Sequence, residues 1–149
     1  MKEARGDLWE LGRNADAVVV TTNGTVKMNG EAVMGAGCAK EALERHPWLG
    51  QRLAKALEEG GNHVHLFYIS PEQGVTMPLI TFPTKKNWWE SADLDLITRS
   101  VMELDKLAWD HKWEKIVMPR PGIGNGGLRW EDVLPIVQLL DDRFTIVTW

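Results

Sequence analysis

Hydrophobic positions recur along the chain in two periods, and these periods predict strands and helices in turn. Residues 17–22 form an apolar, β-branched run of the kind that fills a strand buried on both faces. Alternating positions predict strands over 63–69 and 76–82, and short apolar runs predict strands over 116–118 and 144–148. We expect these strands to share one sheet.

Segments with helical spacing separate the predicted strands. Residues 38–46 contain helix formers, a proline follows them, and residues 48–59 place leucines four positions apart. A long helix is predicted over 93–108 and a last one over about 130–140. Strands and helices in alternation, with strands too apolar to face water on either side, predict a three-layer α/β/α sandwich around a mixed, mostly parallel sheet.

Composition adds limits on size, partners and location. The chain has 149 residues without an internal repeat or linker, so we expect residues 1–149 to form a single domain. A net charge of -4 provides no global attraction to nucleic acid, so a polyanion would have to be held locally. We expect a cytoplasmic protein, because the sequence has one cysteine, no signal peptide and no apolar membrane stretch. We also expect a monomer. The spacing of the histidines does not match a metal site.

Two glycine-rich loops each join an apolar strand to a helix. Residues 33–37 lead directly into a helix, where backbone N–H groups and the helix dipole form an anion site suited to phosphate. Residues 119–127 contain a GxGxxG match, but it lies outside a first βαβ unit, so a Rossmann site is not expected there. The glycines could instead serve tight turns alone. Together, however, the two loops could enclose one diphosphate.

A third loop, residues 82–89, ends a strand with paired lysines followed by paired tryptophans. Ligands of such sheets bind beyond the carboxyl ends of the strands, so a lysine here can face the ligand. A wall formed by Trp88 or Trp89 would reduce its solvation and favour the neutral, nucleophilic amine. The alternative is a pair of solvated surface lysines.

Several motifs together resemble the macrodomain family. They are Gly6-Asp7-Leu8, Val33-Met34-Gly35-Ala36-Gly37, and Met118-Pro119-Arg120 followed by a glycine loop and Trp130-Glu131. They occur in the family's order and span nearly the whole chain. Within the family, the segment from Phe82 to Trp88 looks like that of terminal ADP-ribose glycohydrolases and of antitoxin macrodomains that remove ADP-ribose from thymidine in DNA.

The resemblance implies a role for each candidate residue. Lys85 occupies the catalytic position, Asp7 should accept a hydrogen bond from the adenine amino group with Leu8 beside it, Asn23 should approach the distal ribose, and Trp149 should lie near the adenosine end. The remaining implied ligand-binding residues lie in the two glycine loops, where the diphosphate is expected: Gly35, Ala36, Gly37, Cys38, Pro119, Gly122, Gly124, Asn125, Gly126 and Gly127. No metal or redox cofactor is implied.

Two departures from the family pattern are present, and the first bears on the substrate. Hydrolases of this branch that act on protein glutamate carry an aspartate where this chain has Gly126, whereas antitoxin-like members have glycine. The first loop, residues 23–31, is also longer than expected. We therefore predict an ADP-ribosyl glycohydrolase that acts on ADP-ribosylated DNA in preference to protein. The alternatives are a module that binds ADP-ribose without hydrolysis, and a nucleotide-dependent oxidoreductase or regulator that uses residues 122–127.

Overall fold

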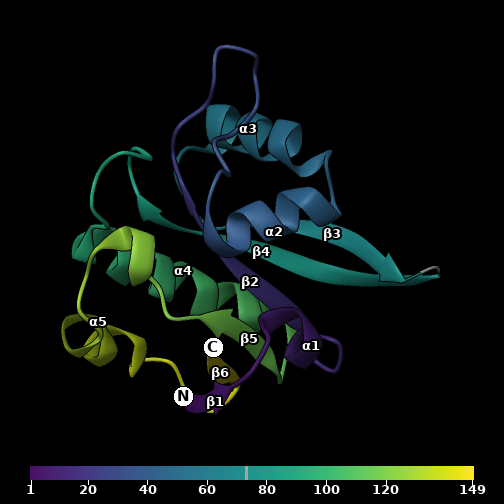
Figure 1. Cartoon of the computed structure of the whole chain (residues 1–149). Coiled ribbons are helices and arrows are strands. Elements are labelled where there is room, and N and C mark those ends of the chain that lie inside the picture. Colours follow the sequence, from purple (N-terminus) through teal and green to yellow (C-terminus); the bar gives the residue numbers. More distant parts are fainter. Residues whose placement is uncertain (73) are drawn as a thin grey trace.

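The computed structural model describes residues 1–72 and 74–149 and is built on a six-stranded sheet with the order β1-β6-β5-β2-β4-β3 (Figure 1). Neighbouring strands are parallel throughout, except that β3 runs antiparallel to β4. The prediction of a mixed, mostly parallel sheet is confirmed. The strands are β1 (Lys2–Arg5), β2 (Ala17–Asn23), β3 (His65–Glu72), β4 (Val75–Lys85), β5 (Ile116–Pro119) and β6 (Phe144–Thr148).

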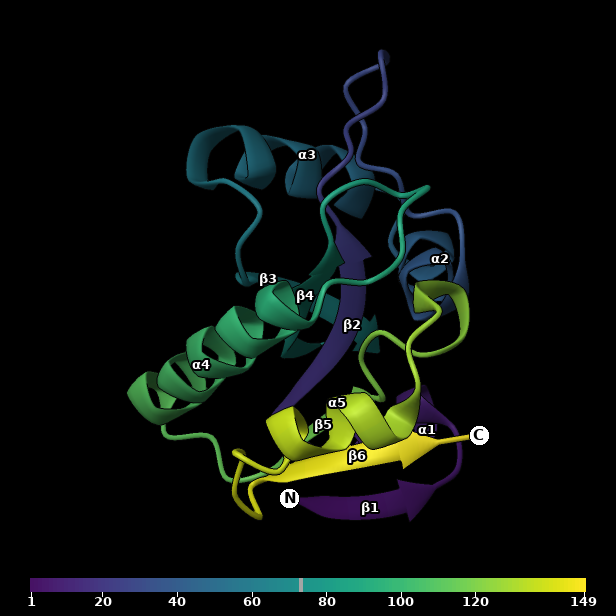
Figure 2. The ribbon, with the colours of Figure 1, turned by 90° about the vertical axis from the view of Figure 1, so that its left-hand side faces the viewer.

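Helices cover both faces of this sheet, which makes the predicted three layers (Figures 1 and 2). One face carries α1 (Leu8–Gly12), α2 (Gly37–Arg45) and α3 (Leu49–Gly60). The other carries α4 (Leu94–His111) and α5 (Trp130–Val137). No helix in residues 1–72 or 74–149 is long and apolar enough to cross a membrane.

The uniformly apolar character of β2 follows from its place between two hydrophobic cores. Val18 and Val20 point into the core beneath α1, α2 and α3, whereas Ala17 and Val19 point into the core beneath α4 and α5. A strand whose alternate side chains are all buried shows no polar positions to mark its faces. The continuous run that predicted this strand is thus explained by its central place in the sheet.

The sequence patterns missed β1 and α1 because both elements are short. Three of the four residues of β1 are exposed, so no apolar pattern marks it. Pairing with β6 and a hydrogen bond from the amino group of Met1 to the Leu140 carbonyl, 2.8 Å long, stabilise it instead. The Asp7 carboxylate caps α1, which has only five residues. Two helix ends differ from the predicted ones. Asp93 is the N-cap of α4, which continues beyond the predicted end to His111, and α5 ends earlier than predicted, at Val137.

Candidate functional site

The carboxyl ends of the parallel strands lie along one edge of the sheet, and the strand order sets the sequence of residues there. Asp7 follows β1, Trp149 follows β6, Pro119 ends β5, Asn23 ends β2 and Lys85 ends β4. With about 4.8 Å between neighbouring strands, the four steps from β1 to β4 span roughly 19 Å. The predicted adenine-end and ribose-end residues therefore lie at opposite ends of one row.

At the β1 end of the row, Asp7 and Trp149 come from neighbouring strands. The Gly6 N–H donates to the Thr148 carbonyl at 2.8 Å, which fixes the two strand ends together. Asp7 Oδ1 accepts hydrogen bonds from two backbone N–H groups of α1, so its Oδ2 can accept a bond from a ligand. Trp149 is 62% exposed, whereas Leu8 is 1% exposed and packs in the core. Only the backbone of Leu8 can reach a ligand.

In the middle of the row, the start of α2 presents free backbone N–H groups. Gly35, Ala36 and Gly37 are exposed, and the N-cap residue Ala36 provides no side-chain hydrogen bond to the helix. The first N–H groups of a helix have no partner within the helix, and the helix dipole makes them attractive to an anion. The thiol of Cys38 accepts a hydrogen bond from the Thr21 N–H at 3.4 Å. Burial raises the pKa of this thiol, so Cys38 can offer its backbone N–H but not a thiolate.

The second glycine loop faces the start of α2, as the two ribbon views agree (Figures 1 and 2). It contains a short 3-10 turn, Gly124–Gly126, in which Gly124 has a φ of +69° and is exposed. The carbonyl of Gly126 accepts a hydrogen bond from the Ala92 N–H at 2.8 Å. Gly122 is different, because it is buried and a Cβ there would lie 2.8 Å from Ile97 Cδ1. Packing against α4 accounts for a glycine at position 122, and its contact with a ligand stays a prediction.

Lys85, the last residue of β4, is directed at the second glycine loop. Its Nζ donates hydrogen bonds to the Asn125 carbonyl at 2.9 Å and to the Trp88 carbonyl at 3.3 Å. Lys86 points elsewhere, with its Nζ 3.9 Å from a carboxylate oxygen of Asp93. Trp88 contacts Lys85 through its backbone carbonyl and is 55% exposed as a residue, and the tryptophan wall stays a prediction.

The end of β4 is fixed by contacts that sequence patterns did not identify. The buried hydroxyl of Ser100 in α4 donates to the Pro83 carbonyl at 2.8 Å, and the Asn62 side-chain amide donates to the Lys85 carbonyl at 3.0 Å. The register with β2 shifts between Thr22 and Asn23, a β-bulge or similar irregularity of the kind that redirects side chains beside binding sites. The one available signal was a serine, Ser100, on the apolar face of a predicted helix.

Asn23 pairs with Lys85 across the sheet, but its side chain supports the first loop. Its Nδ2 donates to the Val33 carbonyl at 3.1 Å, and its Oδ1 accepts from the Thr25 N–H at 2.9 Å. The Thr25 hydroxyl in turn accepts a hydrogen bond from the Trp88 N–H at 3.1 Å. The first and third loops are therefore joined to each other beside Lys85.

Comparisons with known proteins identify proteins that are similar to this chain. No family model matches the chain. Curated relatives from Mycobacterium tuberculosis and Thermus aquaticus, each named DNA ADP-ribosyl glycohydrolase, are 31% identical over 130 residues and 29% identical over 140 residues. These matches cover 86% and 93% of this chain but 35% and 37% of the relatives, so the chain spans about a third of their length.

Solved structures agree with the curated relatives. The macrodomain of Mycobacterium tuberculosis DarG is 29% identical with a TM-score of 0.76, covering 98% of this chain and 95% of its own. The macrodomain of Thermus aquaticus DarG is 27% identical with a TM-score of 0.78, covering 99% and 97%. The chain has the macrodomain fold and is similar to these DarG macrodomains. A third structure, Thermosipho africanus DarTG in complex with ADP-ribose, shares the fold with a TM-score of 0.78. It is 22% identical, and the match covers 98% of this chain and 41% of that one.

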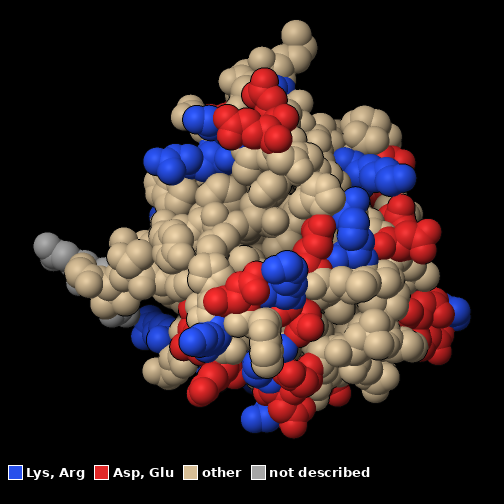
Figure 3. Space-filling model, turned by 180° about the vertical axis from the view of Figure 1, so that it is seen from behind, with Lys and Arg blue, Asp and Glu red and all other residues tan. Residues whose placement is uncertain are grey.

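The charge of this macrodomain gives no strong electrostatic attraction to a polyanion on the face shown in Figure 3, where basic and acidic side chains are interspersed. Within residues 1–72 and 74–149, no group of three or more His, Cys, Asp or Glu side chains could hold a metal ion. The groups that the described residues bring to the candidate site are backbone N–H groups, the Asp7 carboxylate and the Lys85 side chain.

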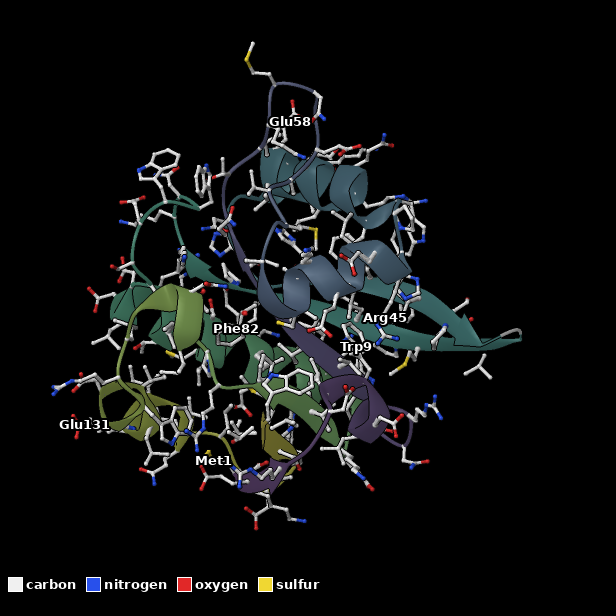
Figure 4. All side chains as sticks on the ribbon, viewed as in Figure 1. Met1, Trp9, Arg45, Glu58, Phe82 and Glu131 are labelled. Atoms are coloured by element: carbon white, nitrogen blue, oxygen red, sulfur yellow. The ribbon has the colours of Figure 1, made fainter. Side chains whose placement is uncertain are left out.

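A separate cavity of about 510 Å³ lies between α1, the end of α2 and the first residues of β4. Asp7 is the one residue that it shares with the predicted site. Beside it, the Arg45 guanidinium lies 4.6 Å from the centre of the Trp9 ring, and Figure 4 shows these two side chains next to each other. Because it is lined mainly by residues away from the carboxyl edge of the sheet, this cavity is distinct from the row that ends at Lys85.

Proposed function

We propose that this macrodomain removes ADP-ribose from modified DNA. The placement of Lys85 carries the proposal, because its Nζ lies 2.9 Å from the Asn125 carbonyl at the end of the row of strand ends. The names and roughly 30% identity of the curated relatives support the same activity. Since the chain spans about a third of those relatives, the activity is a proposal for this chain rather than a transfer of the name.

The row of strand ends accommodates ADP-ribose in an extended conformation. Asp7 accepts from the adenine amino group through Oδ2, with Trp149 beside the adenosine. The diphosphate lies between the exposed start of α2 at Gly35 and the turn at Gly124, where backbone N–H groups compensate its charge. The distal ribose then reaches the end of β2 and β4, which brings its anomeric carbon to Lys85. Calorimetry should show tighter binding of ADP-ribose than of NAD, because nicotinamide would project where the distal ribose is enclosed.

The two hydrogen bonds of Lys85 constrain its chemistry. The Nζ atom is tetrahedral, and the bond to Cε and the two donated hydrogens occupy three of its four directions. The fourth direction carries a hydrogen in the ammonium form and a lone pair in the amine form. Lys85 can therefore present either a donor or a nucleophile to the substrate without losing the carbonyl contacts that hold it.

Two roles follow from these two forms. As an amine, Lys85 attacks the anomeric carbon while the bond from that carbon to the nucleobase breaks, and the base takes the proton that Nζ loses. Water then attacks the same carbon, the carbon–Nζ bond breaks, and a proton from the water returns to Nζ as ADP-ribose is released. As an ammonium, it donates a hydrogen bond to the leaving group while water attacks. Mass spectrometry of the protein quenched during turnover distinguishes them, because the first role leaves ADP-ribose covalently attached to the peptide that contains Lys85.

The substrate class is tested by giving the protein ADP-ribosylated DNA and ADP-ribosylated protein in parallel and measuring released ADP-ribose. We expect release from the DNA, and the glycine at position 126 is consistent with this preference. Release from the protein alone would contradict the proposal. Tight binding of ADP-ribose without release from either substrate would instead support a module that binds ADP-ribose without hydrolysis.

We also propose that residues 1–149 act as one monomeric domain in the cytoplasm. The two hydrophobic cores support a single domain, because they share the same central sheet. The single cysteine is compatible with a reducing compartment. Light scattering of the purified chain tests the monomeric state.

A further inference from the structure

The segment that joins α3 to β3 reaches the end of β4, at the main chain of the candidate catalytic lysine. Asn62 in this segment donates a hydrogen bond from Nδ2 to the Lys85 carbonyl at 3.0 Å. The Asn125 and Trp88 carbonyls hold the amine at the other end of the same side chain. The four-carbon stem of the lysine is therefore held by hydrogen bonds at both ends, which restricts where Nζ can lie.

Asn62 is in turn held by α4. The Arg99 guanidinium donates to the Asn62 carbonyl, and Arg99 Nε lies 3.8 Å from a carboxylate oxygen of Glu103. The same carboxylate accepts a hydrogen bond from the Val64 N–H at 3.0 Å, and its Oε2 lies 2.6 Å from His63 Nδ1. Several contacts thus tie this segment to one helix, so that Asn62 is presented to β4 from a fixed support.

The surroundings of the Asn62 amide are tightly packed. A Cβ at Gly24 would lie 2.8 Å from Asn62 Nδ2 and 2.8 Å from the Lys86 carbonyl oxygen. The Gly24 N–H donates to that carbonyl at 2.9 Å. Only glycine allows so close an approach of one main chain to another. The first loop, the third loop and the segment before β3 therefore meet at the carboxyl end of β4.

The other polar atom of the Asn62 side chain shows that this residue does little for the stability of the fold. Its Oδ1 is buried and accepts no hydrogen bond from the residues that the structure describes. A buried acceptor without a partner lowers stability, whereas the bond from Nδ2 raises it, so the two effects of the amide oppose each other. The position of Lys85 provides a separate reason for an amide here.

We propose that Asn62 is a positioning residue that acts on the reaction through Lys85. This inference rests on the proposed function and adds a residue from outside the row of strand ends. The amide fixes the main chain from which the lysine extends, and displacement of a reacting group by about 1 Å can lower a rate roughly a hundredfold. Within the described part of the chain, the hydrogen bonds of Asn62 join it to Lys85 and Arg99 alone, so ADP-ribose affinity should not depend on it.

The test measures release of ADP-ribose from ADP-ribosylated DNA by wild type, Asn62→Ala and Asn62→Asp. The aspartate keeps the shape of the side chain, but its ionised carboxylate cannot donate to the Lys85 carbonyl. Each variant should lower kcat roughly ten- to a hundredfold, while KM and the ADP-ribose affinity from calorimetry stay within about threefold. The Tm of Asn62→Ala should stay within about 4 °C of wild type, because the two effects of the amide on stability oppose each other.

Hydrogen exchange tests the same contact without turnover. In Asn62→Ala, the backbone N–H groups of residues 84–88 should exchange roughly three- to thirtyfold faster, because the end of β4 opens more often, whereas those of β6 should keep their wild-type rates. Asn14→Ala is the matched control, since Asn14 is exposed and lies just before β2, at the opposite edge of the sheet. It should change neither kcat nor the exchange of residues 84–88.

Three results would overturn the positioning role. One is a wild-type kcat in folded Asn62→Ala and Asn62→Asp, whatever the exchange rates. Another is an equal loss of kcat and of ADP-ribose affinity, which would mean a general effect on the fold. The third is exchange at residues 84–88 that stays at the wild-type rate. Failure of the proposed function is a separate result, namely no release of ADP-ribose by wild type, and the exchange measurement still shows in that case whether Asn62 holds Lys85.

Discussion

A side chain added at Gly35 should separate ligand binding from folding. A Cβ at this exposed residue would meet no atom within 4 Å, and its φ lies outside the left-handed region, so the fold can accept Gly35→Val. The valine side chain would occupy the space where the diphosphate approaches the start of α2. A hydrogen bond to a charged group contributes about 1.5 to 3 kcal/mol, so displacing one should weaken ADP-ribose binding roughly ten- to a hundredfold.

Gly12→Ala is the matched control, because it should lower the stability of the fold and leave the ADP-ribose affinity of the folded protein unchanged. A Cβ at Gly12, at the end of α1, would lie 2.5 Å from Val18 Cγ2 in the core. Overpacking of this kind costs about 1 to 3 kcal/mol, which corresponds to a fall in Tm of roughly 2 to 12 °C. Calorimetry with ADP-ribose and thermal unfolding are measured on both variants. Wild-type affinity in folded Gly35→Val would refute the diphosphate site at α2.

Two further predictions concern groups that support the site. Ser100→Ala leaves the Pro83 carbonyl without its buried partner, so the free energy of unfolding in urea should fall by about 1 to 3 kcal/mol; an unchanged value would show that this bond is not stabilising. Burial raises the pKa of the Cys38 thiol, so its contribution to stability is present below the unfolded-state pKa of about 8.5 and is lost as pH rises above it. Wild type should lose stability faster than Cys38→Ala above that pH, and parallel curves would contradict this.

Periodic patterns predicted the elements that make the sheet and its layers, since burial dictates those patterns directly. The run at 17–22 indicated a central strand because both of its faces are covered, and the residues at 93–108 indicated α4 because one face packs on the sheet. β1 left no such pattern, because its stability comes from backbone pairing with β6.

For the site, the sequence predicted which residues lie at the ends of strands, but it did not predict which groups those residues contact. It could not separate Gly35, which is exposed, from Gly122, which is buried against α4, because both are glycines in similar loops. It predicted Trp88 as a side-chain wall for Lys85, but it could not predict the hydrogen bond from Lys85 to the Trp88 carbonyl. Such distinctions depend on which way a loop turns, and that is decided by long-range contacts such as the one from Thr25.

The central claim is that Lys85 acts on the scissile end of bound ADP-ribose. The measurement is release of ADP-ribose from ADP-ribosylated DNA by wild type, Lys85→Ala and the control Lys86→Ala, with ADP-ribose affinity determined for each by calorimetry. We expect Lys85→Ala to abolish release while its affinity stays within about tenfold, or about 1.4 kcal/mol, and Lys86→Ala to resemble wild type. Release at the wild-type rate by Lys85→Ala would contradict the account.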